Sequence, residues 1–299
     1  MDKLNPLMLI LGSNGQIGSA LSKVCAKKNL AFVTLNRSQI DLCRERDLRE
    51  KLNQLRPGII LNAAAFTAVD LAETDLARNQ QLNHQLPFIL AQWCAESRAK
   101  LVHYSSDYVY SGAGDGPWSE EDPCTPLNAY GRAKLAGDRA IREAGCDHFI
   151  LRTSWVYSVG GKNFLNTMLE LGQQREQLQV VDDQFGSPSY ALDLATATLH
   201  ALLDGAQRRV FPSGVYHLTN AGWTTWWEFA KTIFDILDER GIPHRVRELV
   251  KIDSTQLVRP ALRPKNSRLN CRKFIDTFAY PLPHWREALA RCLAFKFGG

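Results

Sequence analysis

The chain has 299 residues and a net charge of +5, from 36 Lys and Arg against 31 Asp and Glu; 45% of its residues are hydrophobic and 22% are charged. These values suit a folded protein of one large or two coupled domains and exclude a disordered chain. No apolar run approaches the ~20 residues that cross a bilayer, and the start at Met1 lacks the apolar core of a secretory signal. We therefore expect a cytoplasmic protein with no membrane partner.

Short apolar runs alternate with segments of helical periodicity over the first half of the chain. Unbroken apolar runs of this length indicate strands that are buried on both faces, as in a parallel sheet. We expect strands at 7–11, 31–35, 59–61, 101–105 and 148–152, and helices from the first glycine-rich loop to 28 and at 44–55, 81–97 and 129–144. The alternation predicts an α/β fold, a Rossmann-type doubly wound parallel sheet.

Three spaced glycines, Gly12, Gly15 and Gly18, follow the first strand. Glycine permits a positive φ at the turn, lets a pyrophosphate approach the main chain and allows the helix to pack closely on the strand. The N-terminus of the following helix then supplies N–H donors to the phosphates. Because a strand precedes the loop and a helix follows it, the pattern predicts a dinucleotide site.

The second strand is followed by Asn36 and Arg37, where NAD-preferring sites usually carry an Asp or Glu for the ribose hydroxyls. No carboxylate is present to repel a 2′-phosphate, and Arg37 is suited to pair with one. The sequence thus favours NADPH, with NADH left open. Asp41 and Leu42, a few residues on, are candidates for contact with the adenine.

Tyr130 and Lys134 lie four residues apart, and therefore on one face, of the helix expected at 129–144. A neighbouring ammonium favours the phenolate and draws the pKa of a tyrosine toward neutrality, where acid–base transfer is most effective. The fourth strand ends at Ser106 and Asp107, at the edge where parallel sheets bind ligands. Ser106 could then share a hydrogen bond with the substrate oxygen that Tyr130 protonates; the alternative is that Ser106 and Asp107 only cap a turn.

The regular alternation weakens after Tyr157 and gives way to short helices and Pro-rich loops. We expect residues 1–157 to form the dinucleotide-binding domain, with 191–219 returning to it, and 158–299 to form mostly a smaller, interleaved C-terminal substrate-binding lobe.

Residues 240–273 hold ten Lys or Arg against two acids, a net charge of +8, so that the other residues sum to −3. Such a segment suits either nucleic acid or a small polyanion such as a diphosphate, and a solvated charged face is the alternative.

The seven cysteines are scattered, the closest two being Cys25 and Cys43, and the seven histidines form no HExxH pattern. Neither spacing matches a zinc site or a disulfide framework, so we expect reduced thiols and no metal.

Motifs along the whole chain resemble the dTDP-4-dehydrorhamnose reductase family of the extended short-chain dehydrogenase/reductase superfamily. The more widely shared ones are GQIG at 15–18, NAAAFTAVD at 62–70, YSSDYVY at 104–110 and PLNAYGRAKLAG at 126–137; more particular to the family are RTSWVY at 152–157, DQFGSP at 183–188 and RPKNSRL at 263–269. The resemblance implies that nicotinamide hydride reduces the C4 ketone of dTDP-4-dehydro-L-rhamnose to dTDP-L-rhamnose, for rhamnose-containing surface polysaccharides such as O-antigen or lipopolysaccharide.

The resemblance also implies residue roles. Tyr130 is the acid, and Lys134 and Ser106 complete the catalytic set. Ser106 and Asp107 hold the sugar, and Trp155 packs against it. Apart from the resemblance, the charge of the basic segment makes Arg263 and Arg268 the candidates for a diphosphate clamp. The expected cofactor-binding residues are Gly12, Gly15, Gln16, Ile17, Gly18, Asn36, Arg37, Asp41, Leu42, Ala65, Phe66, Thr67, Tyr130 and Lys134.

Two departures from the family pattern stand out. Ser106 stands where the family often has Thr, and Asn36 where it often has an acidic residue, which leaves coenzyme preference open. Alternative functions are a reductase or epimerase of another nucleotide 4-keto-deoxysugar, and a non-catalytic NADP-binding regulatory subunit of the same fold. A dehydratase usually pairs Asp with Glu at the strand end, which Ser106-Asp107 does not, and a nucleic-acid module would need aromatics among the basic residues. The sequence does not decide between a monomer and a homodimer.

Overall fold

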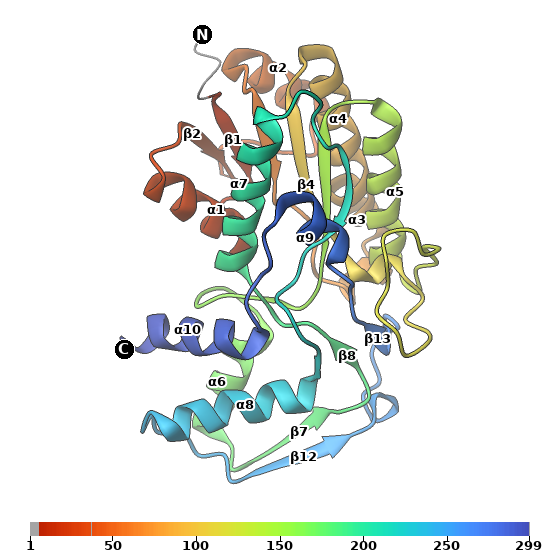
Figure 1. The fold of residues 1–299 in the computed structure, drawn as a ribbon. Coiled ribbons are helices and arrows are strands. Elements are labelled where there is room, and N and C mark those ends of the chain that lie inside the picture. Colours follow the sequence, from red (N-terminus) through yellow and green to blue (C-terminus); the bar gives the residue numbers. More distant parts are fainter. Residues whose placement is uncertain (1–5, 37, 299) are drawn as a thin grey trace.

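The computed structural model describes residues 6–36 and 38–298, and a six-stranded parallel sheet forms its larger part (Figure 1). Neighbouring strands all run parallel, in the order β10-β5-β4-β3-β1-β2. The strands are β1 (Met8–Leu11), β2 (Phe32–Leu35), β3 (Ile59–Asn62), β4 (Lys100–Ser106), β5 (His148–Thr153) and β10 (Gly214–His217). Residues of β1, β3 and β5 are buried throughout, which explains their unbroken apolar sequence.

Helices cover both faces of this sheet. Met8 and Ile10 of β1 pack into a core with α1 (Gln16–Lys27) and α7 (Ala191–Gln207). Leu9 and Leu11, which point to the other face, pack with α2 (Glu45–Leu55), α4 (Leu86–Ser97) and the end of α5 (Ala129–Ala144). The predicted Rossmann-type doubly wound parallel sheet is confirmed.

The strand order reverses direction between β1 and β3, because the chain passes from β1 to β2 on one side and then continues through β3 on the other. In doubly wound sheets ligands bind at this switch point, outside the carboxyl ends of the strands. The glycine-rich loop after β1 and residues 63–67 after β3 both lie there.

One predicted helix differs from the structure. The helix expected at 81–97 is instead α3 (Leu76–Gln80), a π-helical turn η2 (Gln81–Gln85) and then α4. Pro87 lies at the start of α4 and has no N–H to donate to the Asn83 carbonyl, so the regular α-helical ladder is interrupted there. The helical periodicity of the sequence predicts a continuous helix because it takes no account of the missing N–H of Pro87.

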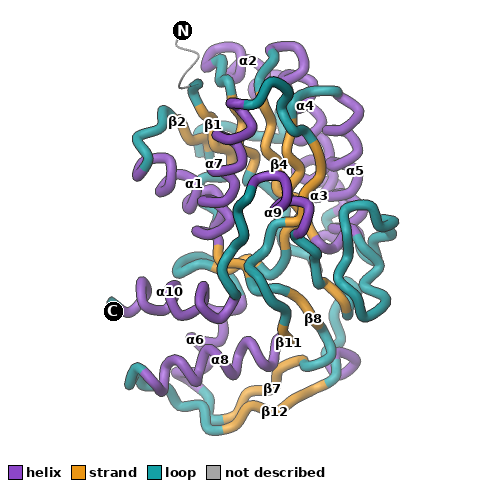
Figure 2. Tube along the Cα trace, viewed as in Figure 1, coloured by secondary structure: helices purple, strands orange, loops and turns teal. Residues whose placement is uncertain are grey.

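A second lobe lies below the main sheet in Figures 1 and 2 and has its own apolar core. Phe229 and Trp285 are buried at its centre. Its helices are α6 (Phe164–Gln174), α8 (Trp226–Glu239) and α10 (Trp285–Phe297), and β7 (Gln177–Val181) pairs in parallel with β12 (Glu248–Ile252).

Short elements connect the two lobes. The three-stranded sheet β11-β8-β13 joins Thr224–Thr225, Phe185–Gly186 and Asn266–Ser267, and β6 (Val156–Tyr157) pairs with β9 (Ser189–Tyr190). The remaining elements are the 3-10 turns η1 (Leu71–Glu73), η3 (Asp107–Val109) and η4 (Ser254–Gln256), and α9 (Arg272–Phe278), which packs on β10 and α7. Among the helices that the structure describes, none is both long and apolar enough to cross a membrane.

Candidate active site

The start of α5 positions Tyr130 and Lys134. The Asn128 side chain caps the helix by accepting the Gly131 N–H at 2.8 Å. A Cβ on Gly131 would lie 2.1 Å from the Tyr108 carbonyl oxygen, so only glycine lets the first turn of α5 approach the turn after β4 this closely. The helix start and the end of β4 are thereby brought together, as the sequence predicted.

The end of β4 carries Ser106 and Asp107, both buried. The Ser106 hydroxyl accepts the Tyr108 N–H at 3.1 Å, which caps η3, and donates to Asp107 Oδ1 at 3.0 Å. Ser267 of β13, which sequence analysis did not identify, donates to Asp107 Oδ2 at 2.5 Å. Burial raises the pKa of Asp107 to about 6, and the hydrogen bonds from Ser267 and Ser106 oppose that rise.

The phenol of Tyr130 lies beside Ser106, between α5 and the turn after β4. Its ring meets the Tyr108 ring edge-on, with centroids 5.7 Å apart. Burial raises the pKa of Tyr130 well above its ordinary value, and the interaction with the Ser106 hydroxyl lowers it in part. The direction is opposite to the one expected from a nearby ammonium, because burial raises this pKa and the carboxylates of Asp107 and Asp138 raise it further.

Lys134 is almost completely buried, at 1% exposed. Its Nζ donates to the Tyr104 carbonyl oxygen at 2.5 Å and lies 3.1 Å from His103 Nε2. Burial lowers the pKa of this lysine to about 8, while the Asp138 carboxylate acts in the other direction. Sequence analysis identified the lysine but not the histidine behind it.

The glycine-rich loop has the close contacts that its sequence predicts. Gly12 has a φ of 75°, and a Cβ there would lie 2.7 Å from the Ala64 nitrogen. A Cβ on Gly18 would lie 2.2 Å from the Gly12 carbonyl oxygen, so the third glycine lets α1 pack against the loop. Gly15 is the N-cap of α1 and offers no side chain to its N–H groups, which suits an anionic ligand at this helix N-terminus.

Gln16 and Ile17, also expected at the cofactor, have different surroundings. The side-chain Oε1 of Gln16 accepts from Ser158 at 3.0 Å and from Asn163 at 2.8 Å, and its Nε2 donates to the Val156 carbonyl at 3.2 Å. This side chain therefore ties the loop to the segment before α6. Ile17 packs against the core between the sheet, α1 and α7.

The residues after β2 form a turn of their own. The side-chain Oδ1 of Asn36 accepts from the backbone N–H and the hydroxyl of Ser38. Asp41 is exposed, whereas Leu42 is buried in the core with α2 and α4 and offers little surface to a ligand. Arg37 lies outside the described residues.

The loop after β3 is held by a buried asparagine. Asn83, in the π turn η2, accepts the Phe66 N–H at 3.1 Å and donates to the Phe66 carbonyl at 2.9 Å. Phe66 is buried beside Tyr130, whereas Ala65 is half-buried and Thr67 is exposed. The π turn thus fixes the loop that the sequence assigned to the cofactor.

Trp155 connects β5 to the second lobe. It has a positive φ of 47°, and its indole stacks on Trp226 with ring centroids 3.5 Å apart. A Cβ on Gly186 would lie 2.4 Å from the indole, so glycine is required there. One face of the ring is already occupied by Trp226, which leaves the rest of the half-buried indole for the expected packing against a sugar.

Arg263 forms a bidentate ion pair with Asp70, and both N···O distances are 2.8 Å. The hydrogen bond from Arg263 holds the pKa of Asp70 below its usual range. Arg268 donates to the Asp115 carbonyl and lies 4.2 Å from the centroid of the Phe185 ring. Other cations of the basic segment also pair with acids from distant segments: Lys251 with Asp182, Lys265 with Asp183 and Lys273 with Glu121. Much of the net charge of +8 on residues 240–273 is therefore balanced by acidic residues from other segments of the chain.

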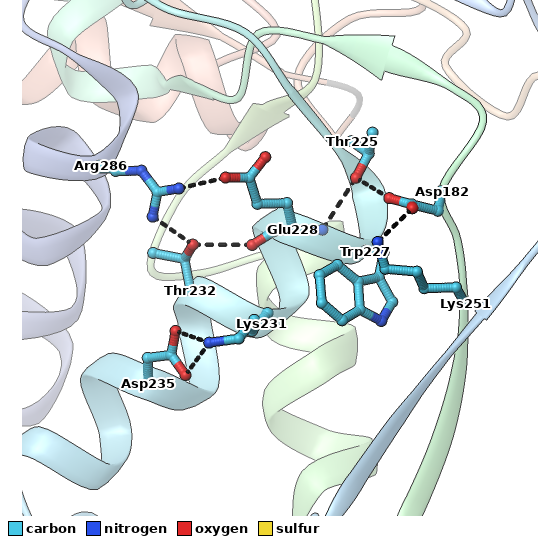
Figure 3. Close-up of a pocket in the computed structure, with 9 residues that line it drawn as sticks. All are labelled: Asp182, Thr225, Trp227, Glu228, Lys231, Thr232, Asp235, Lys251 and Arg286. Carbon is cyan, nitrogen blue, oxygen red and sulfur yellow. Dashed lines mark hydrogen bonds and ion pairs between the residues drawn. The ribbon is translucent and has the colours of Figure 1, made fainter.

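A hollow of about 400 Å³ lies elsewhere, on α8 in the second lobe (Figure 3). Its three cations face its three carboxylates: Lys231 pairs with Asp235 at 2.7 Å, Lys251 with Asp182 at 2.8 Å, and Arg286 with Glu228. No residue assigned to the candidate site lines it. The hollow has no excess charge for a diphosphate and is separate from the candidate site.

The described residues therefore fit a dinucleotide at the switch point of the sheet. The N-terminus of α1 has no side-chain cap, Gly12 and Gly18 let the loop pack closely on Ala64 and on α1, and a buried lysine lies at the carboxyl edge of β4. Within residues 6–36 and 38–298, no group of three His, Cys, Asp or Glu side chains is placed to hold a metal ion.

Comparison with known proteins agrees with this geometry. The model of a family described as the RmlD substrate binding domain matches residues 7–296. The chain is 41% identical over 289 residues to the dTDP-4-dehydrorhamnose reductase of Escherichia coli K12, covering 96% of each chain. It is also similar to a structure of dTDP-4-dehydrorhamnose reductase from Bacillus anthracis in complex with NADP, with a TM-score of 0.89, 31% identity, and 97% and 99% of the two chains covered. A UDP-glucose 4-epimerase of Thermus thermophilus in complex with NAD has the same fold, with a TM-score of 0.81, 18% identity, and 98% and 99% coverage.

Proposed function

The chain belongs to the RmlD family, and we propose that it reduces the C4 ketone of dTDP-4-dehydro-L-rhamnose to dTDP-L-rhamnose with NADPH or NADH. The proposal is supported by its similarity to the dTDP-4-dehydrorhamnose reductases of Escherichia coli and Bacillus anthracis. The family resemblance that the motifs predicted is confirmed. A similar protein of Bacillus subtilis is named as a spore coat polysaccharide biosynthesis protein, and we assign this chain to the supply of rhamnose for surface polysaccharides, in the cytoplasm.

The observation that carries the proposal is the meeting of Ser106 and Tyr130 at the carboxyl edge of the sheet, the same edge that carries the glycine-rich loop. A phenol, a hydroxyl and a buried lysine there form the set that protonates a ketone oxygen as it gains a hydride. We assign residues 1–157 and 191–219 to the dinucleotide and most of 158–299 to the nucleotide sugar.

When bound, the reduced nicotinamide supplies the hydride that adds to C4. Tyr130 gives its proton to the oxygen that develops negative charge, and burial keeps the phenol protonated up to high pH. The Ser106 hydroxyl turns its one proton from Asp107 Oδ1 to the same oxygen, and Asp107 holds a neighbouring sugar hydroxyl. Lys134 supports the tyrosine and the ribose of the cofactor.

A direct assay tests the proposed function. The protein is incubated with enzymatically generated dTDP-4-dehydrorhamnose, coenzyme oxidation is followed at the nicotinamide absorbance, and the sugar product is identified by NMR. We expect oxidation that depends on the substrate, and dTDP-L-rhamnose as the product. A 4-epimeric product would assign the chain to another deoxysugar, and no oxidation with either coenzyme would contradict a reductase.

The coenzyme preference depends on Arg37. Because no carboxylate precedes it at position 36, we expect Arg37→Ala to raise the KM for NADPH about tenfold, the loss of one charge-assisted hydrogen bond, with little change for NADH. Initial rates with each coenzyme measure this. Equal increases for the two coenzymes would show that Arg37 does not read the 2′-phosphate.

The diphosphate clamp makes a prediction at Arg263. We expect Arg263→Glu to raise the KM for the nucleotide sugar about tenfold or more, because a charge-assisted contact becomes a repulsive one. Arg272→Glu is the matched control, since Arg272 belongs to the same basic segment but pairs with Asp276 on its own helix. Asp70→Asn distinguishes substrate binding by Arg263 from its ion pair with Asp70. If Arg263 serves only the ion pair, Arg263→Glu and Asp70→Asn both change stability and leave the KM for the nucleotide sugar unchanged.

A further inference from the structure

A line of buried hydrogen bonds leads from Lys134 to the neighbouring strand of the sheet. Lys134 Nζ lies 3.1 Å from His103 Nε2, and His103 Nδ1 lies 3.0 Å from the amide nitrogen of Asn62. Asn62 and His103 are register partners on β3 and β4, and both are completely buried. Each group must therefore find its hydrogen-bond partner within the protein.

The direction of these bonds is set from the Asn62 end. Its carbonyl oxygen accepts the Ala64 N–H at 3.2 Å, so its NH₂ group faces His103 and donates to Nδ1. In a neutral imidazole whose Nδ1 accepts, the proton resides on Nε2. The Nε2–H of His103 then points at Lys134 Nζ.

An ammonium at Lys134 would bring two donors face to face, because a protonated lysine has no lone pair. A neutral amine satisfies every contact: its lone pair accepts from His103 Nε2–H, and its own N–H donates to the Tyr104 carbonyl. With the neutral amine, each hydrogen bond from Asn62 through His103 to Lys134 pairs one donor with one acceptor.

We propose that His103 is a positioning residue for Lys134, held by Asn62 in the Nε2–H tautomer, so that it donates to the lysine and favours the neutral amine. The inference rests on the proposed function only in so far as Lys134 belongs to the catalytic set. Two directions agree with it: burial lowers the pKa of Lys134 to about 8, and burial together with the nearby lysine lowers the pKa of His103 well below its usual range.

Other groups around Lys134 leave this assignment in place. Asp138 favours the ammonium, but its carboxylate is shared with Arg152, at 3.1 Å. The Glu73 carboxylate accepts the Ala129 N–H at the start of α5 and so serves the helix end. The titratable groups that face this part of α5 are Tyr130 and Asp138 on α5 itself, His103 and Tyr104 on β4, Asp107 and Tyr108 on η3, Glu73 on η1 and Arg152 on β5.

The tautomer is measured directly on the intact protein, by NMR of ¹⁵N-labelled histidine rings between about pH 6 and pH 10. We expect His103 to show the neutral Nε2–H tautomer throughout, and its signal is assigned by its loss in His103→Phe. An Nδ1–H tautomer, or an imidazolium within this range, overturns the proposal. If His103→Phe folds poorly, the His103 signal is assigned instead by its shift in Asn62→Leu or in Lys134→Met. The tautomer is then determined from the wild-type spectrum alone.

The lysine is followed by NMR of its ¹³Cε atoms, with Lys134→Met for assignment. In His103→Phe we expect the titration midpoint of Lys134 to rise by about one pH unit, because the donor that stabilised the neutral amine is gone. A fall or an unchanged midpoint overturns the proposal, since a histidine that accepted from an ammonium would give the opposite sign. His148→Phe is the matched control: His148 is buried on β5 and contacts the Cys146 carbonyl, so the lysine should titrate as in wild type.

These spectra need no substrate, so they remain informative if the reductase assay fails. If the assay succeeds, the pH profile of kcat should move in the same direction as the lysine midpoint in His103→Phe, with the cofactor Kd unchanged. An active reductase with an unmoved profile would keep the proposed function and remove His103 from it.

Discussion

Tyr130→Phe is expected to lower kcat by about 10²- to 10⁴-fold while leaving the cofactor Kd unchanged, because it removes a general acid and nothing else. The ring that remains keeps its edge-on contact with Tyr108 and its place beside Phe66. Only the hydroxyl beside Ser106 is lost. Single-turnover rates with saturating substrate, together with cofactor binding followed by fluorescence, measure the two quantities separately.

The raised pKa of Tyr130 gives this experiment a second readout. A phenol held protonated by burial is available as a donor throughout the neutral range, so wild-type activity should persist as the pH rises to the ordinary pKa of tyrosine. Tyr280→Phe is the matched control, because Tyr280 packs against the core on the face of the sheet that carries α1 and α7. A Tyr130→Phe variant as active as Tyr280→Phe would remove the tyrosine from the mechanism.

The larger lobe was predictable because its signal is local. Strands such as β1 and β3 are buried on both faces and read as unbroken apolar runs, and α5 has the predicted bounds. The second lobe was not predictable in the same way. Its β7 and β12 are about 70 residues apart in the chain, and their pairing depends on contacts that no periodicity reports.

The candidate site divides along the same line. Ser106, Tyr130 and Lys134 lie on one strand end and one helix, so spacing and motif suffice to group them. Ser267 reaches Asp107 from 160 residues away, and nothing near it in the sequence indicates that contact. His103 did leave a signal: it is a polar residue in the middle of an apolar strand, where burial requires a partner.

The family-specific segment at 152–157 begins with Arg152, and its structure shows what that arginine does. Its guanidinium lies 3.1 Å from the Asp138 carboxylate, and the two side chains are 4% and 1% exposed. It also donates to the Tyr110 hydroxyl at 2.7 Å, and that hydroxyl lies 2.7 Å from His217 Nε2. The ion pair thus joins β5 to α5, and the hydrogen bonds of Tyr110 extend the contact to β10.

We expect Arg152→Met to lower the free energy of unfolding by about 3–5 kcal/mol, because it leaves the Asp138 charge buried without its partner. Urea unfolding followed by tryptophan fluorescence, at one fixed protein concentration, measures the loss. Lys231→Met is the matched control: the pair of Lys231 with Asp235 is about half exposed, so its removal should leave the urea midpoint nearly unchanged. Equal midpoints for the two variants would contradict the assigned role.

The double variant Arg152→Met/Asp138→Leu distinguishes an unpaired charge from lost packing. Removing both charges removes the desolvation cost of the carboxylate, so the double variant should be more stable than Arg152→Met alone. If it is instead less stable by the sum of the two single changes, the pair contributes through its packing and through the Tyr110 hydrogen bond. In the first case the buried pair serves to fix how α5 lies on β5, and with it the position of Lys134 four residues before Asp138, since the same helix carries both.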